Sequence, residues 1–375
     1  MTHTPSYLLC LNVGSTSVKF ALFEQNLEQT LVLSGSVKAI GTAPRLTTSQ
    51  GVSELLAQEA THEDAVDAIF EHTPSRSHIT GVIHRIVHGG TLFTKSCILT
   101  TSVLSALTQF ESLAPLHQPH NLAGVRIAQT LLPHAIQMGA FDTAFHTTLP
   151  LFATTLALPS RVREKGVRRY GFHGLSYAWT ARILKKEHPE SYRGRVVAAH
   201  LGGGASVCAM KGGISMDTSM GMTALEGPPM GTRSGSIDPG VVLFMLEALE
   251  MGLDEVTDCL YEESGLKGLS GLSGEAKDLL ASPDPNARFA LEVFAYRVAQ
   301  YMASMCVAMD GVDAFVFTGG IGEKAAPIRD MILERLSFLG KKPIHIIVAN
   351  EEAYMAREAH LLLSSREKKH IPRQH

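Results

Sequence analysis

Short apolar runs along this chain alternate with polar turns that contain glycine. The apolar run 7–11 stops at the polar turn 12–17, and apolar residues resume at Val18. The same order recurs later, with the apolar run 195–200, the glycine turn 202–204 and the apolar run 205–210. This pattern predicts a strand, a turn and a second strand. Two similar hairpins about half a chain apart indicate an internal duplication, with one domain per half.

Helical spacing separates these hairpins. Apolar residues recur with a helical period over 102–110, 121–132, 241–251 and 287–309. A third glycine segment, 318–322, follows the apolar run 314–317, and a helix is expected from about Ala325. Strands that alternate with helices predict an α/β protein. At 375 residues the chain exceeds one compact core, so a domain boundary is expected after the strand that ends at Asp142, where Pro150 breaks the chain.

Composition narrows the class of protein. Hydrophobic residues make up 45% of the chain, charged residues 18%, and the net charge is −3. These values are typical of a soluble enzyme and argue against nucleic acid or a membrane as a partner. No run approaches a membrane span, and the N-terminus lacks the basic flank of a signal peptide. The five cysteines are scattered without a C-x-x-C pair, so we expect neither disulfides nor zinc but a reducing cytoplasm.

The glycine turns indicate a phosphate ligand. A turn without Cβ atoms lets backbone N–H groups approach an anion closely. Around the first turn, Asn12, Ser15, Ser17 and Lys19 add side-chain donors. A plain hairpin is the alternative for any single turn, but three such turns in one chain favour phosphate. Neither a P-loop nor a dinucleotide fingerprint occurs.

Candidate chemical groups stand at the ends of apolar runs or beside glycines. Asp142 is the strongest, because open α/β sheets bind ligands at the carboxyl ends of their strands. Arg85 precedes a glycine pair, although a single buried arginine is more often a structural ion pair. His173 lies between aromatic and glycine residues, where a hydrogen-bonded core histidine is the alternative. His84 and His88 have the spacing of a metal pair but lack a third ligand.

These residue types together favour phosphoryl transfer. Arg85, Arg233 and His173 could neutralise the charge of a transferring phosphoryl group, and Asp142 with a glutamate could hold Mg²⁺. A carboxylate acceptor with a pKa near ~4.3 is already a nucleophile at neutral pH, so no general base is required. Alignment and charge neutralisation would then be the protein's task.

The stretches "LNVGSTSVKF", "HRIVHGG", "FDTAFH", "RRYGFHG", "DTSMGMTALEG", "MGTRSG", "FTGGIGE" and "NEE" resemble the acetate kinase family. They occur in the family's order over residues 7–357. The resemblance implies the sugar kinase, Hsp70 and actin superfamily: an α/β protein of two duplicated ribonuclease-H-like domains with an interdomain active-site cleft. The domains would be 1–146 together with the tail from about 353 to 375, and 147–352. The resemblance further implies a homodimer that binds a small carboxylate and ATP with Mg²⁺ or Mn²⁺.

The resemblance also assigns roles to residues. The implied catalytic residues are Arg85, Asp142, His173 and Arg233. Arg85 would also bind the substrate, and the other implied substrate contacts are Val87, Leu116, His117 and Phe172. The implied nucleotide contacts are Ser15, Ser17, Lys19, His200, Gly202, Gly203, Gly204, Glu275, Ala276, Lys277, Gly320, Ile321 and Gly322. Asn12 and Glu351 would serve the metal, with Glu352 as the alternative to Glu351.

Four positions depart from the family's pattern. Gly203 replaces an asparagine that would donate to the nucleotide phosphates, Ala224 replaces a pocket proline, Lys324 replaces an asparagine, and Ser236 replaces an aspartate. They leave the implied catalytic groups in place. The implied reaction is reversible transfer from ATP to acetate. Propionate or butyrate kinase remains an alternative, as does a non-catalytic nucleotide-responsive protein of the same fold, against which the four catalytic groups argue.

Overall fold

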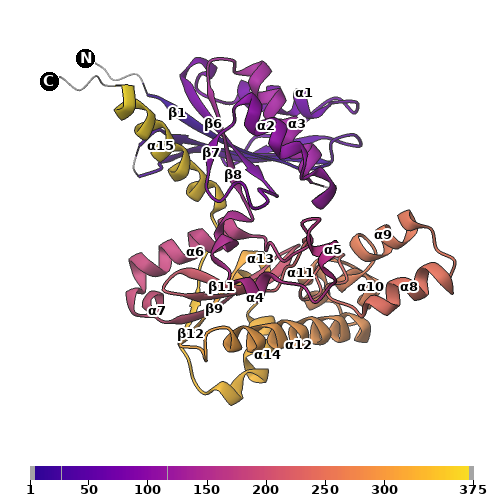
Figure 1. The fold of residues 1–375 in the computed structure, drawn as a ribbon. Coiled ribbons are helices and arrows are strands. Elements are labelled where there is room, and N and C mark those ends of the chain that lie inside the picture. Colours follow the sequence, from indigo (N-terminus) through magenta and orange to yellow (C-terminus); the bar gives the residue numbers. More distant parts are fainter. Residues whose placement is uncertain (1–4, 27, 116, 371–375) are drawn as a thin grey trace. The chain divides into compact units, whose positions relative to one another are not determined.

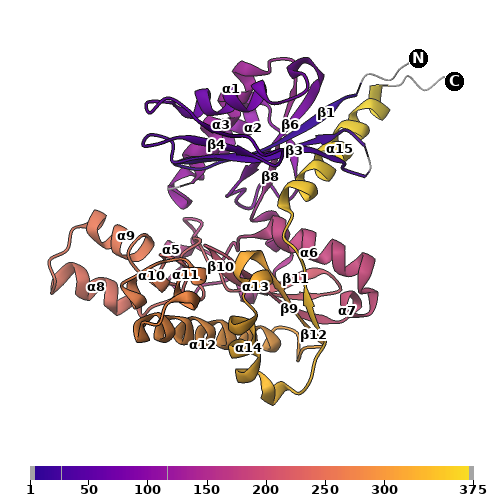
Figure 2. The same ribbon diagram turned by 180° about the vertical axis from the view of Figure 1, so that it is seen from behind.

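A computed structural model describes residues 5–26, 28–115 and 117–370. The chain divides into two compact units, drawn in Figures 1 and 2. Unit 1 contains the described residues up to Ala144 together with those from Asn350 onward, and unit 2 is Phe145–Ala349. Among the described residues, no helix is both long and apolar enough to cross a bilayer.

Unit 1 is built on an eight-stranded sheet in the order β5-β4-β3-β2-β1-β6-β8-β7. Its strands are β1 (Tyr7–Val13), β2 (Ser17–Glu24), β3 (Leu31–Lys38), β4 (Arg45–Thr48), β5 (Ser53–Leu55), β6 (Ile79–Ile86), β7 (Cys97–Ile98) and β8 (Ile136–Phe141). Its α-helices are α1 (His62–Glu71), α2 (Thr101–Thr108), α3 (Gln118–Leu131) and α15 (Glu351–His370). Strands β1, β6 and β8 are parallel, whereas β1, β2 and β3 are antiparallel.

Strand β1 is buried on both faces of the sheet. Its side chains alternate between the two faces, and each face is covered by a different set of helices. Leu9 and Leu11 belong to the apolar core that includes residues of α1 and α3. The intervening Cys10 faces α15, where its thiol donates to the carbonyl of Glu352. Figure 1 shows α15 on one side of this sheet and α1 and α3 on the other. The first turn of α15 therefore lies on the face of the sheet that carries Asn12.

Unit 2 is built on a five-stranded sheet in the order β11-β10-β9-β12-β13. Its strands are β9 (Arg195–Leu201), β10 (Ala205–Lys211), β11 (Ile214–Thr218), β12 (Ala314–Thr318) and β13 (Ile344–Ile346). Its α-helices are α4 (Leu151–Thr154), α5 (Ser160–Arg163), α6 (Gly174–Glu187), α7 (Pro189–Arg193), α8 (Pro239–Glu247), α9 (Leu253–Tyr261), α10 (Gly265–Ser270), α11 (Ala276–Ala281), α12 (Pro285–Val307), α13 (Gly319–Lys324) and α14 (Ala326–Arg335). Helices α6 and α12 cover opposite faces of the sheet (Figure 2).

The two sheets share one strand order and one set of directions. In unit 1, β3-β2-β1-β6-β8 begins with antiparallel pairs and ends with parallel ones, and β11-β10-β9-β12-β13 in unit 2 does the same. The glycine hairpins β1–β2 and β9–β10 occupy equivalent places. The predicted α/β class is confirmed, and the shared order is the structural form of the repeat seen in the sequence.

Most predicted elements form, with shifts at their ends. The helices predicted from apolar spacing appear as α2, α3, α8 and α12. The helix expected from about Ala325 forms as α14, which begins at Ala326. The glycine turn expected at 318–322 was wrong, because helix α13 already begins at Gly319. Helix propensity does not predict a helix that begins at Gly319 and Gly320, because glycine is unfavourable inside helices. Gly319 itself has φ +77°, and a Cβ there would lie 2.7 Å from the Leu201 carbonyl oxygen, so only glycine fits.

Candidate active site

In unit 1 the candidate residues gather where three parallel strands end. Strands β1, β6 and β8 run in the same direction, so their carboxyl ends share one edge of the sheet. The turn after β1, Val87 after β6 and Asp142 after β8 all lie at this edge, and the Asp142 N–H donates to the Ile86 carbonyl at 3.1 Å. This is the edge at which open α/β sheets bind ligands.

The turn between β1 and β2 presents polar side chains on one face. Asn12 pairs with Lys19 across the hairpin, and Ser17 lies two residues before Lys19 on the same strand. These three side chains therefore project from the same face, while Val13 and Val18 are buried on the other. The Gly14 N–H closes the turn on the Ser17 carbonyl at 2.8 Å. The arrangement suits an anion held by hydroxyl, amide and ammonium donors.

Arg85 and the buried Asp142 form an ion pair. The Nε of Arg85 lies 3.1 Å from both carboxylate oxygens of Asp142, and Nη2 lies 2.7 Å from Oδ2. Asp142 is 1% exposed. Glu351, on the first turn of α15, approaches Arg85 Nε at 4.0 Å. Burial by itself would lower the pKa of Arg85, but Asp142, Glu351 and Glu352 outweigh burial and raise that pKa above its ordinary value.

This geometry leaves part of the Arg85 guanidinium for a ligand. The bonds to Asp142 use Nε and Nη2, and among the described residues none of the recorded hydrogen bonds uses Nη1. A guanidinium has five donors, so Arg85 can hold Asp142 and bind a second oxyanion through the other edge of its fork. The structural role given to a buried arginine and the substrate role implied by the resemblance are therefore compatible.

The donors near Arg85 fit a hard cation. The carboxylates Asp142 and Glu351 and the side-chain amide of Asn12 lie on unit 1 and offer the oxygen ligands that Mg²⁺ prefers. Among the described residues there is no group of three or more histidine, cysteine or acidic side chains placed to enclose a metal. Glu351 is the glutamate that approaches Arg85, whereas the closest recorded contact of Glu352 is its carbonyl with Cys10.

Two polar residues of α3 that sequence analysis did not single out organise this edge. Asn121 accepts from the Val87 N–H at 2.9 Å and donates to the Val13 carbonyl at 2.8 Å. Gln118 accepts from the His88 N–H and donates to the His88 carbonyl. Both side chains are buried, so the ends of β1 and β6 are tied to one helix. Their signal in the sequence is a pair of polar residues three apart on the apolar face of a helix.

The two histidines with metal-pair spacing act separately. His84 bonds to Gln137 at 2.8 Å, while His88 accepts from the Gly90 N–H and stacks on Phe110. Burial lowers the pKa of each to about 4, so both are neutral at pH 7. His117 is half-buried at the start of α3, and Leu116 lies outside the described residues.

In unit 2 the β9–β10 turn lies beside the start of α13. A Cβ placed on Gly202 would lie 3.9 Å from the Gly320 N atom, and one on Gly204 would lie 3.1 Å from His173 Nε2 and 4.0 Å from Arg233 Nη1. Two backbone segments and two basic side chains thus surround one small region of unit 2. A Cβ on Gly203 or Gly320 would meet no atom within 4 Å, so both positions face open space.

His173 is held by a chain of hydroxyl groups. Its Nδ1 lies 2.8 Å from Ser206 Oγ, which lies 2.6 Å from the Tyr177 hydroxyl. The Tyr177 hydroxyl has a further hydrogen bond with the backbone of His200. The His200 ring lies 4.3 Å from that of His173 and bonds to Ser176 at 2.8 Å. Ser206 and Tyr177 were not foreseen, although a serine inside the apolar strand 205–210 was their signal.

Arg233 lies on a long segment without regular structure between β11 and α8. Its Nη1 donates to the Ala224 carbonyl at 3.1 Å, and its own carbonyl accepts from the Met230 N–H. Gly231 donates to the Gly203 carbonyl, which ties this segment to the β9–β10 turn.

The remaining implied contacts of unit 2 lie on α13, α11 and the segment before α6. Ile321 and Gly322 follow Gly320 on α13. Glu275 caps α11, where Ala276 is buried and Lys277 is exposed, so Ala276 offers no side-chain surface for a purine. Phe172 is buried beside His173, and its carbonyl contacts His146.

Comparison with known proteins shows which family this chain belongs to. The sequence profile of the acetokinase family matches residues 7–364. The chain belongs to the acetokinase family. It is 46% identical to an acetate kinase of Rhodopseudomonas palustris strain TIE-1 over 345 residues, which cover 89% of this chain and 87% of that protein.

Two solved structures of the acetokinase family resemble this chain over their whole lengths. The acetate kinase of Porphyromonas gingivalis has a TM-score of 0.87 at 34% identity and covers 96% of this chain and 100% of its own. A propionate kinase of Francisella tularensis has a TM-score of 0.90 at 34% identity and covers 95% and 100%. One of these structures is named an acetate kinase and the other a propionate kinase, so the substrates in their names differ although both structures resemble this chain equally well.

Proposed function

We propose that this chain is an acetate kinase, which reversibly transfers the terminal phosphoryl group of ATP to acetate and yields acetyl phosphate and ADP. The observation that carries the proposal is Arg85, paired through one edge of its guanidinium with Asp142 and retaining Nη1 for a carboxylate. Unit 1 supplies this acceptor site, and unit 2 supplies the glycine turns with His173 and Arg233. The proposal requires both units to act on one pair of substrates.

Each side chain then has a task in aligning the substrates. Arg85 binds the acetate carboxylate and holds it for in-line attack, and the donors of the β1–β2 turn and the β9–β10 turn bind the nucleotide phosphates. Arg233 and His173 neutralise charge on the phosphoryl oxygens as the group moves. Asn12, Asp142 and Glu351 would hold Mg²⁺, which supplies further charge neutralisation of the phosphates.

The hydroxyl chain sets the proton on His173. The Tyr177 hydroxyl is bonded to the His200 backbone and to Ser206 Oγ, which is bonded to Nδ1 of His173. We assign Tyr177 as the donor to Ser206, so that Ser206 donates to Nδ1 of His173. A neutral His173 then carries its proton on Nε2, the nitrogen that faces Gly204. In this tautomer Nε2 donates a hydrogen bond to a phosphoryl oxygen without a change of protonation.

Acetate-dependent formation of hydroxamate from ATP and hydroxylamine tests the activity. Arg233→Ala should lower turnover by roughly 10³-fold, as for other arginines at phosphoryl-transfer sites. Arg182→Ala, at an exposed position of α6 in the same unit, should retain normal turnover. Absence of acetate-dependent product in the unchanged protein would instead favour a non-catalytic nucleotide-binding protein.

A propionate kinase is the second candidate, since a protein of that name is as similar in structure as an acetate kinase. Val87 is buried at the end of β6 and its β-branched side chain is stiff, so we assign it to the wall that limits acyl length. Overpacking by one methylene costs about 1–3 kcal/mol, which exceeds the ~0.8 kcal/mol gained by burying it. Acetate should therefore be preferred, and Val87→Ala should shift preference towards propionate. Better use of propionate than acetate by the unchanged protein would select the second candidate.

We also propose a homodimer in the cytoplasm. All five cysteines are free thiols, which suits a reducing compartment. Helix α8, the segment after it and the start of α9 expose six apolar side chains: Val241, Leu243, Phe244, Leu246, Leu249 and Leu253. Exposed apolar side chains that gather on a surface mark an interaction site, so we assign this face to the dimer contact. Phe244→Glu should shift the mass measured by light scattering from two chains to one, while Val307→Glu, at an exposed valine of α12, should leave it unchanged.

A further inference from the structure

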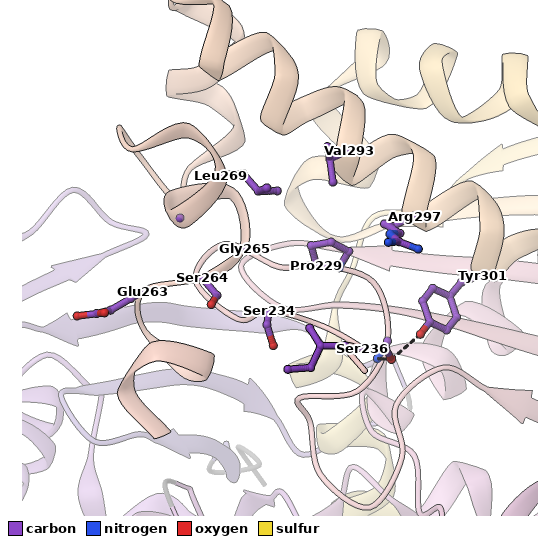
Figure 3. Close-up of a pocket in the computed structure, with 13 residues that line it drawn as sticks. Pro229, Ser234, Ser236, Glu263, Ser264, Gly265, Leu269, Val293, Arg297 and Tyr301 are labelled. Carbon is purple, nitrogen blue, oxygen red and sulfur yellow. Dashed lines mark hydrogen bonds between the residues drawn. The ribbon is translucent and has the colours of Figure 1, made fainter. Parts of the chain in front are cut away.

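Unit 2 contains a pocket of about 440 Å³ that the proposed reaction does not use. It lies between α12, the segment 227–237 and the segment 263–269 (Figure 3). Its volume is within the range of small-molecule sites, about 300–1,000 Å³. Apolar side chains form part of the wall, and the polar groups come from Ser234, Ser236, Glu263, Ser264, Arg297 and Tyr301.

The charge in this pocket is positive at one end. Arg297 contacts two neutral groups: its Nη1 donates to the amide oxygen of Gln300, and its guanidinium lies over the Tyr296 ring. Among the described residues, no carboxylate lies close enough to Arg297, within 4.0 Å, to form an ion pair. Two other charged residues act on the pKa of Tyr301: Glu226 raises it and Arg169 lowers it. These two side chains form an ion pair with each other at 2.8 Å. Glu263 lies at the opposite end of the pocket from Arg297 in Figure 3.

Donor hydroxyls adjoin Arg297. The Tyr301 hydroxyl donates to Ser236 Oγ at 2.5 Å, and the Gly227 N–H donates to the same oxygen at 3.1 Å. Ser236 therefore accepts twice, and its own proton remains for an acceptor in the pocket. Burial raises the pKa of Tyr301, so this hydroxyl stays protonated at neutral pH. A guanidinium and a hydroxyl donor on one wall match the oxygens of an anion.

The side chain at position 236 affects the charge of this part of the pocket. The acetokinase pattern has an aspartate at this position, and a carboxylate here would add a negative charge beside the Tyr301 hydroxyl. The serine of this chain is neutral, so the charge of Arg297 remains for a ligand. We propose that this pocket binds a small anion whose carboxylate or phosphate oxygens are held by Arg297 and Ser236.

The pocket also adjoins the backbone of a proposed catalytic residue. Ser234 follows Arg233 directly, and a Cβ on Gly265 would lie 2.7 Å from the Arg233 carbonyl oxygen. Binding in the pocket nevertheless requires neither ATP nor acetate, so the inference goes beyond the proposed function and can fail independently of it.

Equilibrium dialysis of the full chain without nucleotide tests the inference, with radiolabelled succinate in one arm and inorganic phosphate in the other. The two arms separate a carboxylate site from a phosphate site. Arg297→Gln and Ser236→Asp should each weaken binding of the preferred anion at least about tenfold. Arg288→Gln is the matched control, because Arg288 lies on the same helix, is highly exposed and pairs with Glu292 outside the pocket.

An anion could also bind the proposed phosphate and carboxylate sites, so only the component sensitive to residues 236 and 297 belongs to this pocket. Saturable binding that both variants lose and Arg288→Gln keeps would support the site. Absence of saturable binding of either anion up to about 10 mM would overturn it. Binding that neither pocket variant alters would also overturn it, since the anion would then occupy a different site.

Discussion

Removal of Arg85 should destabilise the protein as well as inactivate it. In Arg85→Ala, the Asp142 carboxylate loses all three of its hydrogen bonds to Nε and Nη2 while only 1% of Asp142 is exposed to water. Removing one member of an ion pair whose other member is buried costs about 3–5 kcal/mol. For a unit of this size, each kcal/mol lowers the melting temperature by about 2–4 °C, so a decrease of roughly 10 °C is expected.

A second substitution separates the two effects. Asp142→Asn removes the charge that Arg85→Ala strands, so the double variant should recover about 2 kcal/mol of the lost stability. Turnover should not recover, because both side chains belong to the proposed catalytic group. The second change would thus restore part of the stability and leave turnover low.

Thermal melts followed by circular dichroism and the hydroxamate assay measure the two quantities on the same samples. Arg126→Ala is the control, because Arg126 is exposed on α3 of the same unit and its loss should cost less than about 0.5 kcal/mol. If Arg85→Ala melts within about 2 °C of this control, Asp142 does not depend on Arg85 and the reasoning is refuted. A double variant less stable than Arg85→Ala would refute it equally.

Three further predictions concern unit 2. Gly203→Asn should lower the Michaelis constant for ATP about tenfold, since a side chain there meets no atom within 4 Å and restores a phosphate donor, whereas Gly203→Ala should give no gain. Ser206→Ala should lower turnover about 10- to 100-fold with little change in the Michaelis constants. Without the Ser206 hydroxyl, nothing would hold His173 in the tautomer with its proton on Nε2. An unchanged turnover would contradict the role given to the hydroxyl chain. Burial lowers the pKa of His146 to about 4, below its unfolded value of ~6.5, so only the unfolded chain gains a proton between these values. Stability from this residue is therefore present above pH ~6.5 and falls as the pH drops towards 4, by on the order of 1–2 kcal/mol at pH 5; urea titrations of His146→Gln should show a shallower decline.

The amino-acid sequence by itself determined the elements and the chemical groups. Apolar runs broken by glycine turns predicted both hairpins, and helical spacing predicted the long helices, because these patterns depend on neighbours only a few residues apart. The place of Asp142 at a strand end followed from the same local pattern. Most of the candidate residues needed no more than this, together with the family's motifs.

Only the tertiary structure decided which of these groups meet. Arg85 and Asp142 are 57 residues apart and Cys10 and Glu352 are 342 apart, and each pair is joined by the order of strands in the sheet and the return of α15. Ser206 could not be linked to His173 before β10 was placed against α6. The pocket around Ser236 likewise exists only because three distant segments converge. Such contacts depend on the packing of whole elements, which local periodicity does not encode.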